Sequence, residues 1–390
     1  MVVVHNRYRF RGGEERAVEL QIRALARSGI RHRLVERRSD ESSRIASGLA
    51  LLAGGAAPDD VARAVREADA AVVHAHNIHP LFGPKSLASA RAHGARVVLQ
   101  LHNVRLFCAI AVAARDGKPC FRCRGRFTLP GLVLNCRGSV PEAVAYAAGL
   151  ALHQPKIWQS VDAFIAPSRH AAEQLALLGV PRERLNVVPH YLPEEAFVSE
   201  SRADMGRFAL AIARLSTEKG LDTAVRAAVA ARIPLRVAGE GPCAEELAAL
   251  ARRFDGDVTF LGQLTRVEVD RELTQAAMLL LPSRYDEFAP YAVLEAMAAG
   301  VPVVGTNLGS VPELVGNELC VAANDVDALA TAARSLWDDP PSRRHHGERL
   351  LSGARARFSE HRYLEDLRRL YALPATRDDS HDHARRSRQT

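Results

Sequence analysis

Two glutamates are the residues of this sequence whose surroundings most clearly call for a chemical partner. Glu287 and Glu295 stand eight positions apart, and the neighbours of Glu295 are Ala, Val, Leu and Met. A carboxylate in apolar surroundings is costly unless something hydrogen-bonds to it. A ribose suits this need, because one carboxylate can accept from two adjacent hydroxyls. We therefore expect Glu295 to bind a ribose and Glu287 to face a cleft, against the simpler alternatives of a polar helix edge and an exposed loop acid.

Two cations follow a strand that we predict over residues 208–213. Arg214 comes directly off this apolar run, and Lys219 lies five positions later, beside the expected start of a helix. Cations next to a helix N-terminus can hold a diphosphate without a metal ion. The alternative of a solvated charge is more credible for Lys219 than for Arg214. The two Asp-x-Asp stretches, 255–257 and 325–327, are interpreted as a turn and a helix cap rather than as metal sites.

Three further loops stand at the predicted carboxyl ends of strands, where open α/β sheets bind ligands. Gly12 and Gly13 precede a helix and could let the backbone approach a phosphate, although a plain turn is more common. His102 follows an apolar run over 97–101 and could touch a ligand or simply bond to backbone. Gly239 begins a tight loop that borders a nucleotide or is only a turn.

The elements that must position these residues alternate regularly between apolar strands and amphipathic helices. Continuous apolar runs at 2–4, 70–74, 97–101 and 163–166 are typical of a parallel sheet covered on both faces. A second series of runs begins at residue 208, after a polar stretch over 192–206 that we interpret as a linker. The pattern predicts an α/β fold with two doubly wound domains.

We expect the following boundaries from these patterns. Residues 1–195 form the first domain, with a Cys-rich insertion at about 104–138, and residues 206–358 form the second domain. A C-terminal helix within 359–375 is expected to pack back on the first domain, and 376–390 form a polar tail that we expect to be disordered.

The composition limits the class of protein. The 390 residues are 47% hydrophobic and carry a formal net charge of +7, which suits phosphate-bearing ligands or anionic surfaces without choosing between them. No signal peptide and no apolar run long enough to span a membrane is visible, so we expect a cytoplasmic protein. The sequence contains no recognisable nucleic-acid-binding module, and we expect no nucleic-acid partner.

Several of these motifs together resemble family 4 of the retaining glycosyltransferases. The Glu287 and Glu295 pair is the specific part of the resemblance, which covers nearly the whole chain up to Tyr371. The other matching segments are Gly12-Gly13-Glu14, Leu101-His102-Asn103, Ala166-Pro167-Ser168, Arg214 with Lys219-Gly220, Gly300-Val301-Pro302-Val303-Val304 and Gly309-Ser310-Val311-Pro312-Glu313-Leu314-Val315. The resemblance implies the GT-B fold, in which two Rossmann-like domains face each other across a cleft.

The resemblance also implies residue roles. Arg214 and Lys219 would hold the donor diphosphate, Glu295 would bind the ribose, and Glu287 would contact the donor sugar and support charge at the reacting carbon. Gly13 and His102 would face the sugar and the acceptor from the first domain. Family members often have glycine after the first glutamate, whereas this sequence has Phe288-Ala289-Pro290-Tyr291, so we expect a bulkier and stiffer wall beside the donor sugar.

The implied function is transfer of a sugar from a nucleotide diphosphate sugar to an acceptor hydroxyl, with retention of configuration. Polysaccharide, glycolipid or glycoconjugate biosynthesis would be the setting, and no further cofactor is needed for catalysis. The alternatives are a nucleotide-sugar epimerase or a phosphorylase on the same fold, or a non-catalytic nucleotide-sugar-binding protein. If the acceptor is lipid-linked, the arginines at 343–357 could make a peripheral contact at the inner membrane face.

Four of the six cysteines gather between Cys108 and Cys136. Cys120 and Cys123 form a Cys-x2-Cys pair, the spacing at which two thiolates meet one tetrahedral ion, and Cys108 and Cys136 flank it. A structural zinc site is one interpretation of this cluster, and the neighbouring arginines would favour thiolates. Reduced and unliganded thiols, disulfides, or a role for Cys120 and Cys123 alone are the alternatives.

Overall fold

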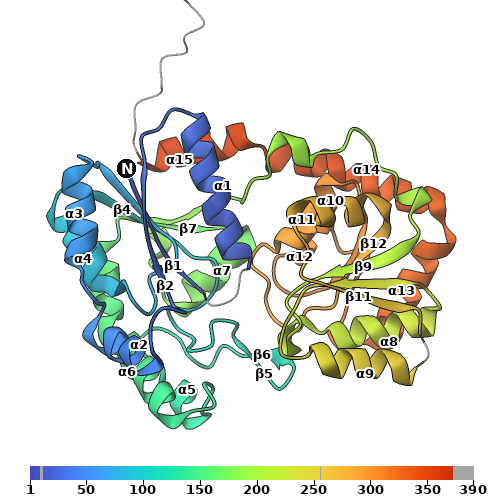
Figure 1. Ribbon diagram of the computed structural model, residues 1–390, viewed down its shortest axis with the longest axis horizontal. Coiled ribbons are helices and arrows are strands. Elements are labelled where there is room, and N and C mark those ends of the chain that lie inside the picture. The colour runs from blue at the N-terminus through green and yellow to red at the C-terminus, as the bar shows by residue number, and fades with distance from the viewer. Residues whose placement is uncertain (9–11, 255, 372–390) are drawn as a thin grey trace, which may run out of the picture.

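The computed structural model describes residues 1–8, 12–254 and 256–371. Two six-stranded parallel sheets, each covered by helices, form two Rossmann-like domains that stand side by side (Figure 1). This is the expected α/β fold class. The expected disordered tail at 376–390 and residues 9–11 of the Gly12 loop lie outside the described residues.

The sheet of the N-terminal domain has the order β2-β1-β3-β4-β7-β8. Its strands are β1 (Val2–Arg7), β2 (Arg33–Arg38), β3 (Val72–Ala75), β4 (Arg96–Gln100), β7 (Ala163–Ala166) and β8 (Leu185–Val187). Its helices are α1 (Gly13–Arg27), α2 (Arg44–Ala53), α3 (Asp59–Glu67), α4 (Gly83–Ala92), α5 (Leu129–Val133), α6 (Val140–Ser160) and α7 (Arg169–Leu178). The central strands β1, β3 and β7 are buried except at Arg7, because helices cover both faces of the sheet.

The sheet of the C-terminal domain has the order β11-β10-β9-β12-β13-β14. Its strands are β9 (Phe208–Ile212), β10 (Leu235–Ala238), β11 (Val258–Gly262), β12 (Ala276–Leu281), β13 (Val303–Thr306) and β14 (Cys320–Val321). Its helices are α8 (Leu221–Ala231), α9 (Ala244–Arg253), α10 (Arg266–Gln275), α11 (Tyr291–Ala298), α12 (Val311–Val315), α13 (Val326–Asp338) and α14 (Pro340–Arg357). Both sheets reverse their order at the first strand, which creates a binding crevice at the carboxyl ends of the strands.

The last helix, α15 (Glu360–Tyr371), crosses back to the N-terminal domain and lies beside α1 (Figure 1). The Tyr371 hydroxyl shares a hydrogen bond with Nδ1 of His74 on β3 and accepts one from Gln21 on α1. Buried polar groups need such partners, so this network fixes where the helix docks.

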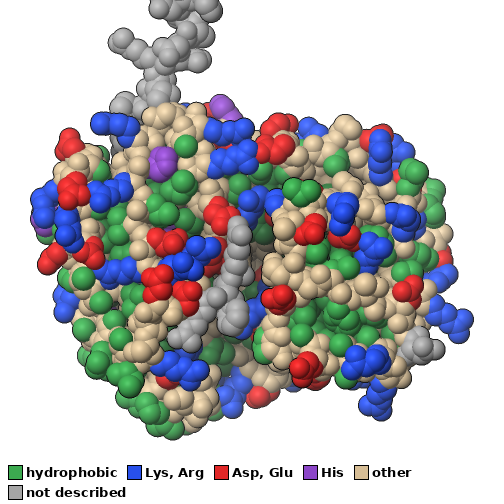
Figure 2. All heavy atoms as spheres, in the orientation of Figure 1, with side chains coloured by type: hydrophobic (Ala, Val, Ile, Leu, Met, Phe, Trp, Pro, Cys, Tyr) green, Lys and Arg blue, Asp and Glu red, His purple; other side chains and the backbone are tan. Residues whose placement is uncertain are grey.

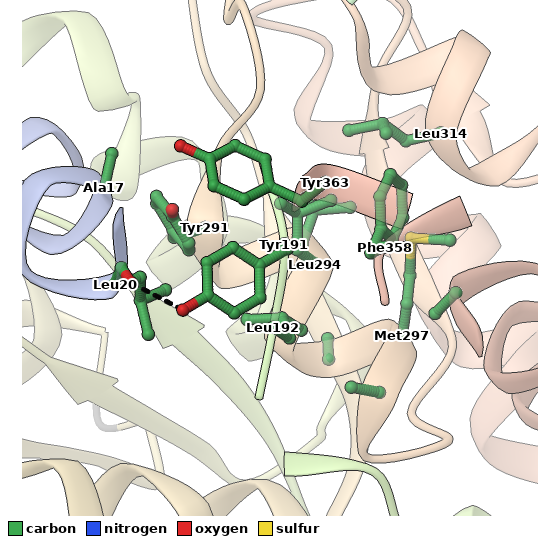
Figure 3. Close-up of a cluster of buried hydrophobic side chains, with 14 of the residues drawn as sticks. Ala17, Leu20, Tyr191, Leu192, Tyr291, Leu294, Met297, Leu314, Phe358 and Tyr363 are labelled. Carbon is green, nitrogen blue, oxygen red and sulfur yellow. Dashed lines mark hydrogen bonds between the residues drawn. The ribbon is translucent and has the colours of Figure 1, made fainter. Parts of the chain in front are cut away.

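One hydrophobic cluster joins the two domains (Figure 3). Tyr191 and Tyr363 stack with their ring centroids 4.9 Å apart, and the Tyr191 hydroxyl donates to the Leu20 carbonyl on α1. Leu294 of α11 and Phe358 pack into the same cluster from the C-terminal domain. The domains are therefore connected through a continuous apolar core beside the crevice.

Within the described residues, we find no helix whose length and apolar character would let it cross a membrane.

Candidate functional site

Lys219 and Glu287 form the centre of the site in the C-terminal domain. Lys219 ends a short 3-10 helix after β9, and Glu287 lies in the loop after β12, the neighbouring strand. The Lys219 ammonium donates to Glu287 Oε1 at 2.7 Å and to the Tyr285 hydroxyl at 2.8 Å. Burial disfavours the charged ammonium, but Glu287 and Tyr285 outweigh burial and raise the pKa of Lys219 above its usual range. Lys219 is therefore a fixed positive charge.

Glu287 is held from several directions. The side chain is buried, and its Oε1 accepts a second hydrogen bond from the Ser283 hydroxyl at 2.7 Å. Its Oε2 accepts from the Tyr285 hydroxyl at 2.7 Å. Both oxygens are thus engaged inside the domain, which fixes the carboxylate in one orientation.

Glu295 lies in α11 and is also buried. It forms an ion pair with Arg266, the first residue of α10. Burial raises the pKa of Glu295, while the charges of Arg266 and of Arg16 on α1 act against the rise. The carboxylate expected to bind a ribose is therefore held by an arginine that the sequence analysis did not single out.

The glycines of the site occupy positions where side chains do not fit or would narrow the crevice. A Cβ on Gly13 would lie 3.4 Å from the Tyr291 ring, so the start of α1 faces the start of α11 across the domain boundary. Gly239 has a φ of +134°, and a Cβ there would lie 2.0 Å from the Ala213 carbonyl. Gly12 donates its N–H to Glu15 Oε2 at 2.8 Å and caps α1.

Arg214 lies at the carboxyl end of β9, as the sequence predicts, and its side chain is exposed. Its carbonyl accepts the N–H of Ser216 at 2.9 Å, which shapes the loop that leads to Lys219. The two cations of the sequence analysis therefore share one loop.

His102 belongs to a row of stacked imidazoles. His74, His76, His102 and His190 stack in turn at centroid distances of 4.6, 5.2 and 5.3 Å, and His190 stacks on Tyr291 at 4.9 Å. His102 Nε2 shares a hydrogen bond of 2.8 Å with His76 Nδ1. The row links the carboxyl ends of the N-terminal strands to α11 of the other domain.

Burial determines the charge state of this row. It lowers the pKa of His74 to about 3 and of His190 to about 4, and it lowers the pKa of His76 and His102 well below the ordinary range. His102 is therefore neutral at pH 7 and can share hydrogen bonds without carrying charge.

A second cluster of buried ionisable side chains, His5, Glu14 and Glu15, lies at the start of α1. His5 stands 4.0 Å from Glu14 and 3.8 Å from Glu15, and neither ring nitrogen has a hydrogen-bond partner among the residues that the structure describes. Burial raises the pKa of Glu14 to about 7, while the pKa of Glu15 is lowered because His5 and backbone N–H groups outweigh its burial. A histidine and two acidic side chains are thus buried together at the start of α1.

A cavity of about 660 Å³ opens between the two domains. The N-terminal domain lines it with Phe121 and the start of α7, and the C-terminal domain lines it with Asp286 and the segment 307–313. His170 Nε2 lies 3.1 Å from Asp286 Oδ2 and bridges the two walls. Asp286 precedes Glu287, so the cavity adjoins the site.

The two aromatic residues of the segment expected to form a bulky wall, Phe288 and Tyr291, lie in different places. The Phe288 side chain is buried in the hydrophobic core of the N-terminal domain, and its carbonyl accepts the Ser168 hydroxyl at 2.6 Å. The aromatic ring anchors the loop to the opposite domain because that is where apolar surface is available. Tyr291 instead supplies the bulk near Gly13.

The Cys-rich insertion brings Cys108, Cys120, Cys123 and Cys136 to one apolar cavity. Among the described residues, however, no group of three or more His, Cys, Asp or Glu side chains is placed to hold a metal ion, so the zinc expectation is not supported. Burial raises the pKa of Cys108 and raises that of Cys123 to about 11. At Cys108 and Cys123 the neighbouring arginines therefore do not favour the thiolates expected from the sequence.

Several groups of the site escaped the sequence analysis. His76 and His190 follow β3 and β8, so the position that identified His102 could also have identified them. Tyr285 lies within the Glu287 segment. Arg16 and Arg266 carry no local signal, because only the packing of α1 and α10 brings them to Glu295.

Two family models match the chain. "Glycosyl transferase 4-like domain" matches residues 12–190 and "Glycosyl transferases group 1" matches residues 194–350. Glycogen synthase of Mycobacterium tuberculosis is 36% identical over 160 residues, which are 38% of this chain and 37% of that protein. The chain thus spans little more than a third of the length of this curated relative.

Solved structures share the fold. Sucrose-phosphate synthase from Thermosynechococcus elongatus superposes with a TM-score of 0.72 at 17% identity, over 96% of this chain and 99% of that one. HepE from Anabaena, in complex with UDP and glucose, gives 0.64 at 14% identity, over 96% of this chain and 100% of that one. The two matched models and the fold agree, and the chain belongs to the GT-B glycosyltransferases of the family 4 type.

Proposed function

We propose that this protein transfers a sugar from a nucleotide diphosphate sugar to an acceptor hydroxyl, with retention of anomeric configuration. The observation that carries the proposal is the Lys219 ammonium held between Glu287 and Tyr285 at the carboxyl ends of β9 and β12. A fixed cation at the crevice is suited to a diphosphate leaving group.

The diphosphate binds at Arg214 and Lys219 in this proposal. Both residues lie on the loop after β9, and Gly12 and Gly13 bring the N-terminus of α1 to the opposite wall. A cation that is already in place stabilises the charge that develops on the leaving diphosphate without costly reorganisation. The structural neighbour HepE, which was solved with UDP, supports a nucleotide diphosphate as the ligand.

Glu295 accepts the ribose hydroxyls, and Arg266 positions it. An ion pair keeps a buried carboxylate charged, which the burial of Glu295 alone would oppose. An ionised carboxylate accepts hydrogen bonds at both oxygens, whereas a protonated one uses one oxygen as an O–H donor. Gly239 borders the nucleotide because its loop packs directly against Ala213.

Glu287 contacts the donor sugar and supports positive charge at the reacting carbon. Its two oxygens already accept from Lys219, Ser283 and Tyr285, which disfavours a role as an attacking nucleophile. The acceptor hydroxyl therefore attacks from the face of the leaving diphosphate, and a phosphate oxygen takes its proton. His102, neutral and partly exposed, offers hydrogen bonding to the sugar and the acceptor.

The acceptor enters through the cavity between the domains. Asp286, His170 and Glu313 line this cavity, and carboxylates with a histidine are good partners for hydroxyl groups. The proposed acceptor class is therefore a hydroxyl-rich molecule in polysaccharide, glycolipid or glycoconjugate biosynthesis.

Calorimetric titration of UDP, GDP and ADP tests the donor site. For whichever diphosphate the parent protein binds, Lys219→Met should weaken binding by about 1.5–3 kcal/mol, the range for a charge-assisted hydrogen bond. Lys156→Met is the matched control, because Lys156 is exposed on α6 of the other domain. Equal affinity of Lys219→Met and the parent protein for every diphosphate would contradict the assignment.

A further inference from the structure

Large apolar side chains gather on one outer face of the N-terminal domain. Figure 2 shows hydrophobic side chains at the lower left, where Figure 1 places α2, α5 and α6. The members of this apolar face are Ile45, Leu49 and Leu52 of α2, Phe127, Leu129 and Val133 of the loop and α5, and Val140, Val144 and Leu152 of α6. Ile45 is 77% exposed and Val133 is 73% exposed, so these side chains do not serve the core.

Close helix packing holds the apolar face together. A Cβ on Gly149 of α6 would lie 2.7 Å from the Leu51 side chain of α2, and one on Gly48 would lie 3.8 Å from Ala145. Small residues at these crossings let the two helices approach, so their exposed stripes form one surface. The Thr128 hydroxyl donates to the Ala147 carbonyl at 2.7 Å and ties the α5 segment to α6.

Positive charge accompanies the apolar face. The segment 122–160 carries five Arg and Lys residues and a single acidic residue, Glu142. The exposed members of this basic border are Arg122, Arg124, Arg126 and Lys156, and Arg44 adds a further charge at the start of α2. Apolar side chains beside arginines suit an interfacial region where acyl chains meet anionic headgroups.

Three of the arginines at 343–357 have partners within the protein. Arg343 is buried and donates to the Ala203 carbonyl, Arg344 pairs with Glu200, and Arg349 pairs with Glu318. These contacts stabilise α14 against its neighbours, which explains the basic cluster structurally.

We propose that the apolar face and its basic border dock this protein on an anionic lipid surface. A second copy of the chain fits less well, because a two-fold contact would bring one basic border against the other. The inference does not depend on the transfer reaction. It does suit a lipid-linked acceptor, because the same insertion also reaches the C-terminal domain. Its β5–β6 hairpin (Ala114–Arg115 and Lys118–Pro119) makes this contact, in which the Gly117 carbonyl accepts a hydrogen bond of 3.0 Å from Asn324.

Vesicle co-sedimentation of the full chain tests the proposal. The two vesicles are phosphatidylcholine alone and phosphatidylcholine with about one-third phosphatidylglycerol. We expect binding to the anionic vesicles at low salt, weaker binding at higher salt because of screening, and little binding to phosphatidylcholine. No binding to anionic vesicles at low salt, or equal binding to both vesicles, would overturn the proposal.

Two kinds of variant separate the contributions of the apolar face and of the basic border to vesicle binding. Leu49→Asp with Val144→Asp places charge in the apolar face and should abolish sedimentation with vesicles. Arg122→Gln with Arg124→Gln should lower the partition coefficient about thirtyfold, because each basic residue at an anionic surface contributes to binding. Met205→Asp, at a position 75% exposed on the other domain, is the control and should bind like the parent.

These positions are exposed, and thermal melting checks that each variant folds like the parent protein. Retained vesicle binding in both double variants would overturn the assignment of this face. The face would instead belong to a second copy under two conditions. The parent would self-associate with rising concentration in light scattering but not bind vesicles, and the Leu49 and Val144 changes would abolish this self-association.

Discussion

Replacing His190 by phenylalanine should make the stability of the N-terminal domain less sensitive to acid. His190 is buried between His102 and Tyr291, and its side chain stacks on both rings. Burial lowers the pKa of His190 to about 4 from an ordinary value of 6.5. Phenylalanine keeps a ring in the stack and removes the titrating group.

The sign and size follow from proton linkage. Between pH 6.5 and about 4 the unfolded chain binds a proton at His190 that the folded chain does not, so stability falls as the pH drops through this window. At about pH 5, roughly 1.5 units below the ordinary pKa, this one residue lowers the free energy of unfolding by about 2 kcal/mol. Glu14, with its pKa raised to about 7, acts in the opposite direction but equally in both proteins.

Urea unfolding at about pH 7.5 and about pH 5 measures the effect, with Trp158 fluorescence as the reporter. Trp158 packs on Phe164 in the N-terminal domain, and Trp337→Phe removes the other tryptophan of the chain from the signal. His190→Phe should lose about 2 kcal/mol less stability than its parent between the two pH values. His361→Phe, at an exposed position, is the control. An equal loss in His190→Phe and its parent would show that burial does not lower the pKa of His190 in the folded protein.

Three further outcomes follow from the geometry of the site. Gly239→Ala should lower the stability of the C-terminal domain by more than about 2 kcal/mol in thermal unfolding, because the position combines a positive φ with a backbone clash. Tyr285→Phe should lower kcat/KM about tenfold or more, since Glu287 and Lys219 lose a shared hydrogen-bond partner. Arg266→Met should raise the pKa of Glu295 further. On acidification, the nucleotide affinity of this variant, measured by calorimetry, should therefore begin to fall at a higher pH than that of the parent.

Each of these outcomes has a comparison that can contradict it. Gly353→Ala is the control for the glycine change, because a Cβ there would meet nothing within 4 Å. Equal melting of the two glycine variants would refute the clash. Unchanged kcat/KM in Tyr285→Phe would remove Tyr285 from the site, and an unshifted pH profile in Arg266→Met would show that Arg266 does not position Glu295.

The sequence predicted the fold class because its strands are continuous apolar runs separated by helices. β12 and β1 are examples whose buried residues form unbroken runs. β2 was missed, since Leu34 and Val35 are its only apolar residues and it is a largely exposed strand at the sheet edge.

The site was predictable where a residue carries a local signal and not where packing creates the contact. Glu295 was identified because a carboxylate stands in an apolar helix, but its ion pair with Arg266 depends on how α10 packs. The burial of Phe288 in the opposite domain likewise required the interdomain arrangement. For the cysteines, spacing predicted proximity at one cavity but not whether the arrangement could hold a metal ion.

The most direct test of the proposed function is the configuration of the bond that the protein makes. Purified protein is incubated with a panel of nucleotide sugars and hydroxyl acceptors, and the proton NMR coupling at the new anomeric centre is compared with that of the donor. We predict a product with the donor's anomeric configuration, and a loss of transfer in Glu287→Gln while the Lys156→Met control remains active. An inverted product, or conversion of the donor to an epimer with no acceptor present, would contradict the account.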